Sequence, residues 1–473
     1  MTIINPNADR REFLKRSSML SIAGAAAPWA MNLAAIGEAA AQSATDYKAL
    51  VCIFLFGGND YANTIIPYDA TNYNKYLALR GATLSIPSAT LTATALTPLA
   101  SAMGGTDLGA RQYALAPNLS PLLPIFNDEK LAVLLNAGTL IQPTTKAQYT
   151  AKSVPLPAKL LSHNDQQSVW QSSAAEGATT GWGGRIGDLF ASGNGNSTFS
   201  CISVSGNAVY LSGSSAVQYQ VSTNGSVALN ALKTPMFGST TIANTLKSMI
   251  TAPSNQLFQS EHARIAKRAV DANDQLTSAL AVTTNKLPAN ALFMSPTFDT
   301  TNSLATQLKM VAQLIAARDT LSAKRQVFFV SLGGFDTHDN LTTDHPALMT
   351  KVSNAMSMFD DAMRKINAHN FVTSFTASDF GRTLTGNGDG SDHGWGSHHL
   401  IMGGAVKGKR FYGTPPEVAN NGADDIGQGR LVPTTSVDQL AGTLASWFGV
   451  SNTDMKVVLP NLGNFSNGNL GFL

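Results

Sequence analysis

The chain has 473 residues, a formal net charge of +2 and only 13% charged residues, whereas globular proteins usually carry about a quarter. This near-neutral balance, with no basic patch and no acidic tail, argues against a nucleic-acid-binding protein. The length suits one large domain or two. Beyond the N-terminal segment no apolar run reaches about 18 residues, so we expect no membrane span in the mature chain.

The first residues have the three parts of an export signal. The pair Arg10-Arg11 precedes an alanine-rich apolar stretch from Ser17 to Ile36, and small residues at 39–41 precede Gln42. A charged start, an apolar middle and an A-x-A end are typical of secretory signals, and the arginine pair indicates the twin-arginine route. We predict a signal peptide over residues 1–41 and a mature chain, 42–473, that works in the periplasm or outside the cell.

Short apolar runs that stop at glycine or serine predict the buried strands of an α/β protein. We expect such strands over residues 49–56, 131–135, 326–332, 371–377 and 400–402. Apolar residues spaced near 3.6 predict helices over residues 304–323, 347–366 and 439–448. The alternation of strands and helices indicates a largely parallel central sheet with helices on both faces.

One stretch of the mature chain has a different composition. Residues 192–254 are rich in Ser, Asn, Gly and Thr, and we interpret them as a β-rich insertion or cap within the main domain. The two cysteines, Cys52 and Cys201, lie in apolar segments typical of buried strands. A disulfide between them is the alternative that an oxidising compartment allows.

Three of the predicted strands end in the same way, with glycine or serine followed by aspartate. Asp60 follows the first strand, Asp336 and His338 follow the third, and Asp379 follows the fourth. A single aspartate in such a place is usually a turn or cap residue. The carboxyl ends of neighbouring parallel strands meet at one edge of the sheet, and three carboxylates there repel each other unless a cation lies between them.

Histidines are concentrated near these aspartates. Three of the eight lie in one short stretch as His393, His398 and His399, and His163 lies in the motif Ser-His-Asn-Asp. Imidazole together with carboxylate is the ligand mixture of zinc, manganese or iron rather than calcium. We therefore predict a divalent metal site among these aspartates and histidines, with zinc or manganese as the cofactor.

These motifs together resemble a known family. Gly57-Gly-Asn-Asp60, Gly333-Gly-Phe-Asp-Thr-His338, Asp379-Phe-Gly-Arg382 and Asp392-His-Gly-Trp-Gly396 are similar to the exported "domain of unknown function fifteen-oh-one" family. Residues 162–166 and 181–185 also fit it. The C-terminal half looks like the wider alkaline phosphatase and sulfatase superfamily. That likeness implies an alkaline-phosphatase-like α/β fold and a two-metal hydrolase of phosphate or sulfate esters.

The resemblance also implies roles for single residues. The metal ligands would be Asp60, Asp336, His338, Asp379, His393 and His398 (or His399). Ser162, at the start of a predicted helix, would be the nucleophile, with His163 beside it and Arg382 as a clamp for the ester oxygens. The alternative for Ser162 is a helix cap paired with Asp165, and Thr144 and Thr145 are alternative nucleophiles. Phe380 stands where the superfamily usually has a metal-binding histidine, so one metal ion instead of two stays open.

The sequence therefore predicts an exported metal-dependent hydrolase of a small or polymeric phosphate or sulfate ester. The alternative is a non-catalytic binding or assembly protein of the cell envelope, with a protein partner and a hydrolase-like fold. The two differ in a measurable way, because only the first turns over an ester.

The export signal can be tested directly. Replacing Arg10 and Arg11 together by Lys should leave the precursor in the cytoplasm, because the twin-arginine route reads the arginine pair itself. Immunoblots of cytoplasmic and exported fractions measure this, and normal export of the double variant would contradict the assignment.

Overall fold

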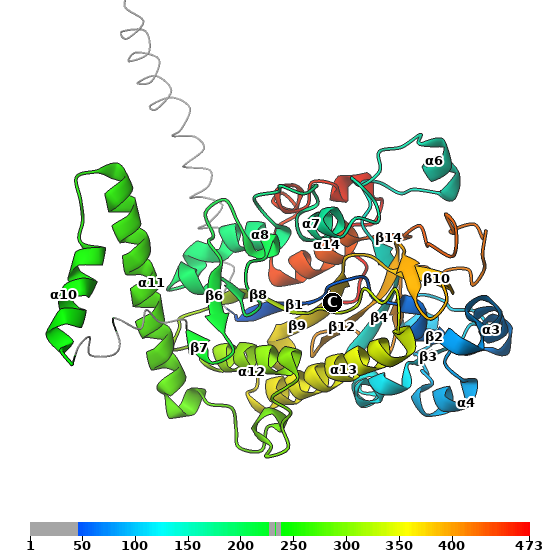
Figure 1. Ribbon diagram of the computed structural model, residues 1–473, viewed down its shortest axis with the longest axis horizontal. Helices are drawn as coiled ribbons and strands as arrows, with labels where there is room; N and C mark the ends of the chain where they lie inside the picture. The colour runs from blue at the N-terminus through cyan, green and yellow to red at the C-terminus, as the bar shows by residue number, and fades with distance from the viewer. Residues whose placement is uncertain (1–45, 227–231, 233–237) are drawn as a thin grey trace, which may run out of the picture.

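The computed structural model describes residues 46–226, 232 and 238–473 (Figure 1). The signal peptide predicted over residues 1–41 lies outside them. Their main feature is a ten-stranded sheet in the order β13-β4-β12-β9-β1-β8-β5-β6-β7, with β14 paired to β4. Within the described part of the chain, no helix is both long and apolar enough to cross a membrane.

The sheet is largely parallel. β12 runs antiparallel to both of its neighbours and β7 runs antiparallel to β6, while the other pairings are parallel. The strands are β1 (Lys48–Leu55), β4 (Leu131–Gly138), β5 (Cys201–Ser203), β6 (Tyr219–Ser222), β7 (Gly225–Ser226), β8 (Arg325–Leu332), β9 (Val372–Ser378), β12 (Ser397–Gly403), β13 (Phe411–Tyr412) and β14 (Thr435–Ser436). Two small sheets pair β2 (Ile65–Pro67) with β3 (Tyr113–Leu115) and β10 (Arg382–Gly386) with β11 (Ser391–His393).

Helices cover both faces of the sheet, because alternate residues of each buried strand point to opposite sides. In β1, Val51 and Ile53 belong to the core under α12 (Ser303–Ala316) and α13 (Leu341–Lys365). Leu50 and Phe54 belong to the core on the other face, under α7 (His163–Ser172), α8 (Trp182–Phe190) and α14 (Val437–Phe448). The predicted mixed α/β architecture with a largely parallel sheet is confirmed, and all five predicted strands are present.

The remaining helices surround these layers. They are α3 (Ala70–Leu84), α4 (Ser88–Leu91), α5 (Leu123–Asn127), α6 (Lys146–Ala151), α10 (Thr240–Thr251), α11 (Leu257–Ala281) and α15 (Met455–Val458). In Figure 1, α10 and α11 form a helical pair at one end of the molecule.

The stretch over residues 192–254 differs from the expected β-rich insertion. β5 pairs with β8 and β6 pairs with β5, so this stretch extends the central sheet, and its last part is the helix α10. The short strand β5 begins at Cys201, in the apolar segment that the sequence marks as a buried strand. Cys52 and Cys201 are both buried and free, so the alternative of a disulfide between them is not realised.

The strands that carry the three aspartates are neighbours. β1 lies between β9 and β8, and Leu55 at its end is in register with both Ser378 and Leu332. Asp60, Asp336 and Asp379 therefore all follow strand ends at one edge of the sheet, as predicted. The turns after β1 and β8 touch, because a Cβ on Gly57 would lie 2.3 Å from the backbone nitrogen of Asp336.

This close approach makes Gly57 a structural requirement. Gly57→Ala should lower the free energy of unfolding by more than about 1 kcal/mol, because φ is +117° there and the methyl group would collide with the Asp336 backbone. Gly333→Ala is the matched control, since a Cβ at that position meets nothing within 4 Å. Denaturant unfolding of both variants measures the difference, and equal stabilities would contradict this reading.

Candidate functional site

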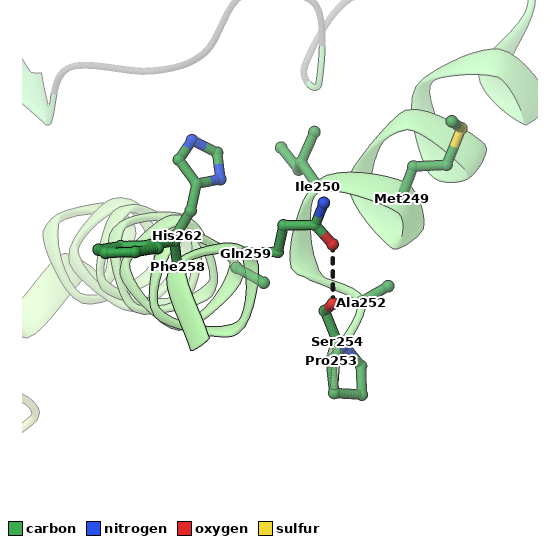
Figure 2. A pocket seen from close by; sticks show the side chains of 9 residues that line it. Met249, Ile250, Ala252, Pro253, Ser254, Phe258, Gln259 and His262 are labelled. Atoms are coloured by element: carbon green, nitrogen blue, oxygen red, sulfur yellow. Dashed lines mark hydrogen bonds between the residues drawn. The ribbon is translucent and has the colours of Figure 1, made fainter. Parts of the chain in front are cut away.

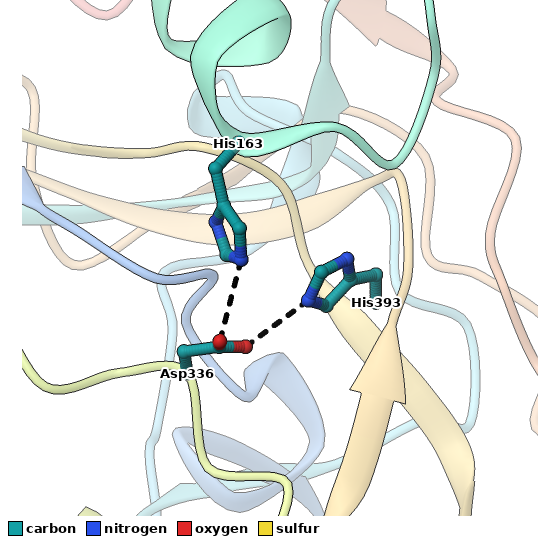
Figure 3. Close-up of side chains that lie close together, drawn as sticks. All are labelled: His163, Asp336 and His393. Atoms are coloured by element: carbon teal, nitrogen blue, oxygen red, sulfur yellow. Dashed lines mark hydrogen bonds and ion pairs between the residues drawn. The ribbon is translucent and has the colours of Figure 1, made fainter.

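Asp336 is the centre of a cluster of histidines at the carboxyl edge of the sheet (Figure 3). His163 Nε2 lies 3.3 Å from Asp336 Oδ2, and His393 Nε2 lies 3.1 Å from Asp336 Oδ1. His338 Nε2 lies 3.1 Å from the same Oδ1. The carboxylate of Asp336 is 42% exposed, so solvent reaches the cluster.

Two of these imidazoles are held in place through Nδ1, the ring nitrogen that does not face Asp336. His163 is the first residue of α7, and its Nδ1 donates to Asp379 Oδ2 at 2.7 Å. His393 Nδ1 donates to the carbonyl of Leu161 at 2.8 Å. Leu161 has φ +73°, a conformation that costs about 1–3 kcal/mol for a residue other than glycine. Because a carbonyl oxygen only accepts, the proton of neutral His393 is on Nδ1, and Nε2 presents a lone pair to the cluster.

His338 completes the group from the turn after β8. Its Nδ1 lies 3.3 Å from Asp392 Oδ1 and its Nε2 lies 3.0 Å from His393 Nε2. Two ring nitrogens at this separation need a proton or a cation between them, because their lone pairs otherwise repel. The three histidines thus direct Nε2 atoms toward one carboxylate.

The charges in the cluster follow from its neighbours. Burial alone would raise the pKa of Asp336, but the hydrogen bond and charge of Arg382 and the nearby His163 hold it below its ordinary value. Burial lowers the pKa of His393. The hydrogen bond to Asp379 raises the pKa of His163. At neutral pH the centre therefore holds an ionised carboxylate that faces a neutral imidazole.

Asp379 lies behind the cluster rather than within it. Its Oδ2 accepts from His163 and from Gln167 Nε2, the latter at 2.8 Å, and its side chain is fully buried. Among the described residues, candidate ligand atoms of His163, Asp336 and His393 lie within 4.8 Å of one another. In this geometry Asp379 orients His163, and its direct binding of a metal stays a prediction.

Asp60 was expected among the metal ligands, and the structure corrects this. Arg80, on α3, donates from both terminal nitrogens to the two oxygens of Asp60, at 2.7 and 2.6 Å. Both side chains are completely buried. Both oxygens of Asp60 are thus engaged by a cation of the protein, and Asp60 is not one of the residues of the histidine cluster.

His398, another of the expected ligands, also lies outside the cluster. It lies in β12, where its Nδ1 accepts from the backbone nitrogen of Asn136 at 3.1 Å and its ring packs against Tyr61. His399 points to the opposite face and packs against Trp170. Burial lowers the pKa of each histidine to about 3. Because β12 begins at Ser397, both histidines are strand residues. Successive side chains of a strand point to opposite faces, so the two rings lie in the cores on the two faces of the sheet and not at its carboxyl edge.

Arg382 was expected to clamp the ester oxygens, but its donors are engaged by the protein. Its Nη1 donates to Asp336 Oδ1 at 2.6 Å and to the Gly57 carbonyl at 3.2 Å, and Nη2 donates to the Ser391 carbonyl. The side chain is completely buried. Arg382 therefore fixes and neutralises Asp336.

Ser162 stands at the N-cap position of α7, but its side chain does not cap the helix. Its hydroxyl donates to Asp165 Oδ2 at 2.9 Å. The structure thus places Ser162 beside His163 in the chain without a hydrogen bond to any group of the cluster. The residues that sequence reasoning missed are Arg80, Leu161, Gln167 and the acceptor role of Asp392, because their contacts depend on how α3 and α7 pack.

The fold and the cluster define an α/β protein with a histidine and carboxylate group at the carboxyl edge of its sheet. Over residues 47–460 the sequence matches the family described as "Protein of unknown function (DUF1501)", and the chain belongs to this family. This confirms the closer of the two resemblances. No curated protein matches the sequence.

Two solved structures resemble the fold weakly. They are "Crystal structure of Ps i-CgsB in complex with k-i-k-neocarrahexaose" and "Crystal structure of Ps i-CgsB", each with 9% identity and a TM-score of 0.35. Each alignment covers 90% of this chain and 78% of the other. A likeness at this level carries no argument about this protein.

The buried pair of Asp60 and Arg80 gives a prediction that separates a structural from a ligand role. Arg80→Met should cost about 3–5 kcal/mol of unfolding free energy, because it leaves a buried carboxylate without its partner. Arg264→Met, which breaks an exposed pair with Glu261, should change stability little. Chemical denaturation measures both, and an equally small effect at Arg80 would show that Asp60 does not depend on that ion pair.

Proposed function

We propose that this protein is an exported metal-dependent hydrolase of a phosphate or sulfate ester, with an alkaline-phosphatase-like fold. The observation that supports this most is the convergence of His163, Asp336 and His393, whose candidate ligand atoms lie within 4.8 Å of one another. The proposed site of action is the periplasm or the outside of the cell, and the proposed catalytic unit is one domain over residues 42–473.

The residues of the cluster fit a divalent cation. Imidazole nitrogens with one carboxylate are the ligands that zinc prefers, and manganese also accepts them. The lone pair of His393 Nε2 lies 3.1 Å from the ionised Asp336 and 3.0 Å from His338 Nε2, a repulsive arrangement that a cation would stabilise. His163, Asp336 and His393 would hold the ion, and His338 is a further donor.

The contacts behind the cluster also suit metal binding. Histidine ligands usually donate their other ring nitrogen to a carboxylate or carbonyl, which fixes the ring and makes the ligating nitrogen more basic. Asp379 does this for His163 and the Leu161 carbonyl does it for His393. Arg382 holds Asp336 by the oxygen Oδ1, while the exposed part of that carboxylate remains accessible to a cation.

A bound divalent metal would supply Lewis acidity toward an ester oxygen. The protein residues would keep the ligands in place and leave one side open to the substrate. Ser162 remains the candidate nucleophile, since it directly precedes His163, and its hydroxyl would have to leave Asp165 to act. The proposed substrate is a small or polymeric ester, with no role for nucleic acid.

A second candidate is a non-catalytic cell-envelope protein, and one surface favours it. The α10–α11 pair borders an open surface hollow of about 600 Å³ that Met249, Ile250 and Phe258 help to line (Figure 2). Met249, Leu257 and Phe258 are 70%, 80% and 88% exposed. Grouped exposed apolar side chains often mark contacts with other proteins. The α10–α11 pair contains no residue of the histidine cluster.

Metal content and turnover together test the proposal. The mature protein, purified after export, should contain zinc or manganese by elemental analysis and should hydrolyse an aryl phosphate or an aryl sulfate, with loss of activity after chelation and recovery on adding the metal. His393→Ala should bind no metal, and Asp379→Asn should weaken metal binding by about 10–100-fold, because it disturbs the orientation of His163.

His262→Ala is the control, because this histidine lies on α11 outside the cluster. Wild-type protein without metal would overturn the metal proposal. Metal without turnover of either ester would favour the envelope protein. Full activity of Ser162→Ala would exclude Ser162 as the nucleophile.

A further inference from the structure

Two buried polar atoms near the cluster have no hydrogen-bond partner within the described residues. They are Asp379 Oδ1 and His399 Nε2. Such atoms are rare in folded proteins, and each one costs free energy unless a water or an ion satisfies it. The two have opposite needs: the carboxylate oxygen requires a donor, and the imidazole nitrogen can supply a proton.

The contacts of His399 favour the tautomer with the proton on Nε2. Thr376 Oγ1 accepts from the backbone nitrogen of Leu400 at 2.9 Å and lies 3.5 Å from His399 Nδ1, so its hydroxyl proton is available to that ring nitrogen. Burial keeps the ring neutral, with a pKa of about 3. In this tautomer Nδ1 accepts from Thr376, and Nε2 carries an N–H that has no partner within the described residues.

Helix α7 packs over both side chains, and these come from neighbouring strands, since Asp379 directly follows β9 and His399 lies in β12. His163, Gln167 and Trp170 are four and three residues apart, so they lie on one face of the helix. His163 and Gln167 contact Asp379, and the Trp170 ring lies 5.0 Å from the ring of His399. Asp379 and His399 thus lie beneath successive turns of one helix. A water with two hydrogen bonds of about 2.8 Å bridges polar atoms on side chains placed in this way.

We infer that an ordered water links His399 Nε2 to Asp379 Oδ1 and makes His399 a positioning residue for the cluster. The water accepts from His399 and donates to Asp379. The chain of contacts then runs from His399 through the water to Asp379, from Asp379 to His163, and from His163 to Asp336. The effect on metal binding rests on the proposed function, whereas the water and the orientation of His163 do not.

Three variants separate this role from a purely structural one. His399→Met keeps an apolar side chain of similar length and removes the N–H. His399→Gln replaces the N–H by an amide donor of similar reach. His398→Met is the matched control, because His398 is equally buried in the same strand but points to the opposite face.

Zinc affinity is measured for each full-length mature variant by competition with a chelating dye. His399→Met should bind zinc about 10–100-fold more weakly, His399→Gln should recover most of that loss, and His398→Met should bind zinc like the wild type. Unchanged zinc affinity in His399→Met, or equal losses in the two Met variants, would overturn the positioning role.

Two measurements remain decisive if the wild type binds no metal. A crystal structure of the wild type should show a water within hydrogen-bond distance of both atoms, and the ¹⁵N signals of the His163 ring should change in His399→Met but not in His398→Met. Absence of that water, or unchanged His163 signals, would overturn the inference by itself. Failure of zinc binding in the wild type alone would instead count against the proposed function.

Discussion

Three carboxylates at the ends of three adjacent parallel strands are the constraint on which the site depends. Asp379, Asp60 and Asp336 follow β9, β1 and β8, which are neighbours in the sheet. Carboxylates gathered in this way destabilise the fold unless each has a cationic or hydrogen-bonding partner. The surrounding elements supply one partner for each: Arg80 for Asp60, Arg382 for Asp336, and a histidine of α7 for Asp379.

The three aspartates differ in how far their oxygens remain free to bind a ligand. The pair of Asp60 and Arg80 is bidentate and completely buried, so it has a structural role. Asp336 is held at one oxygen by a buried guanidinium, yet it is 42% exposed and has three imidazoles around it. The same residue type at equivalent strand ends thus serves different purposes, because burial and the neighbouring cation differ.

Helix α7 joins the edge of the sheet to the core beneath it. Its first residue, His163, reaches Asp336, whereas Trp170, two turns later, packs in the core with His399. The apolar contacts of Trp170 fix α7 in the core, and His163 is held at the first residue of the same helix. The exposed cluster therefore depends on packing that is fully buried.

The sequence by itself determined the α/β class, the five main strands and the edge at which the aspartates gather, since these follow from hydrophobic periodicity and the rule that parallel strands end together. It also singled out His163, Asp336, His338 and His393 by residue type. Only the tertiary structure decided that Asp60 pairs with Arg80 and that His398 points into a core. Such pairings join segments distant in the chain, and no local pattern specifies which side chain reaches a given carboxylate.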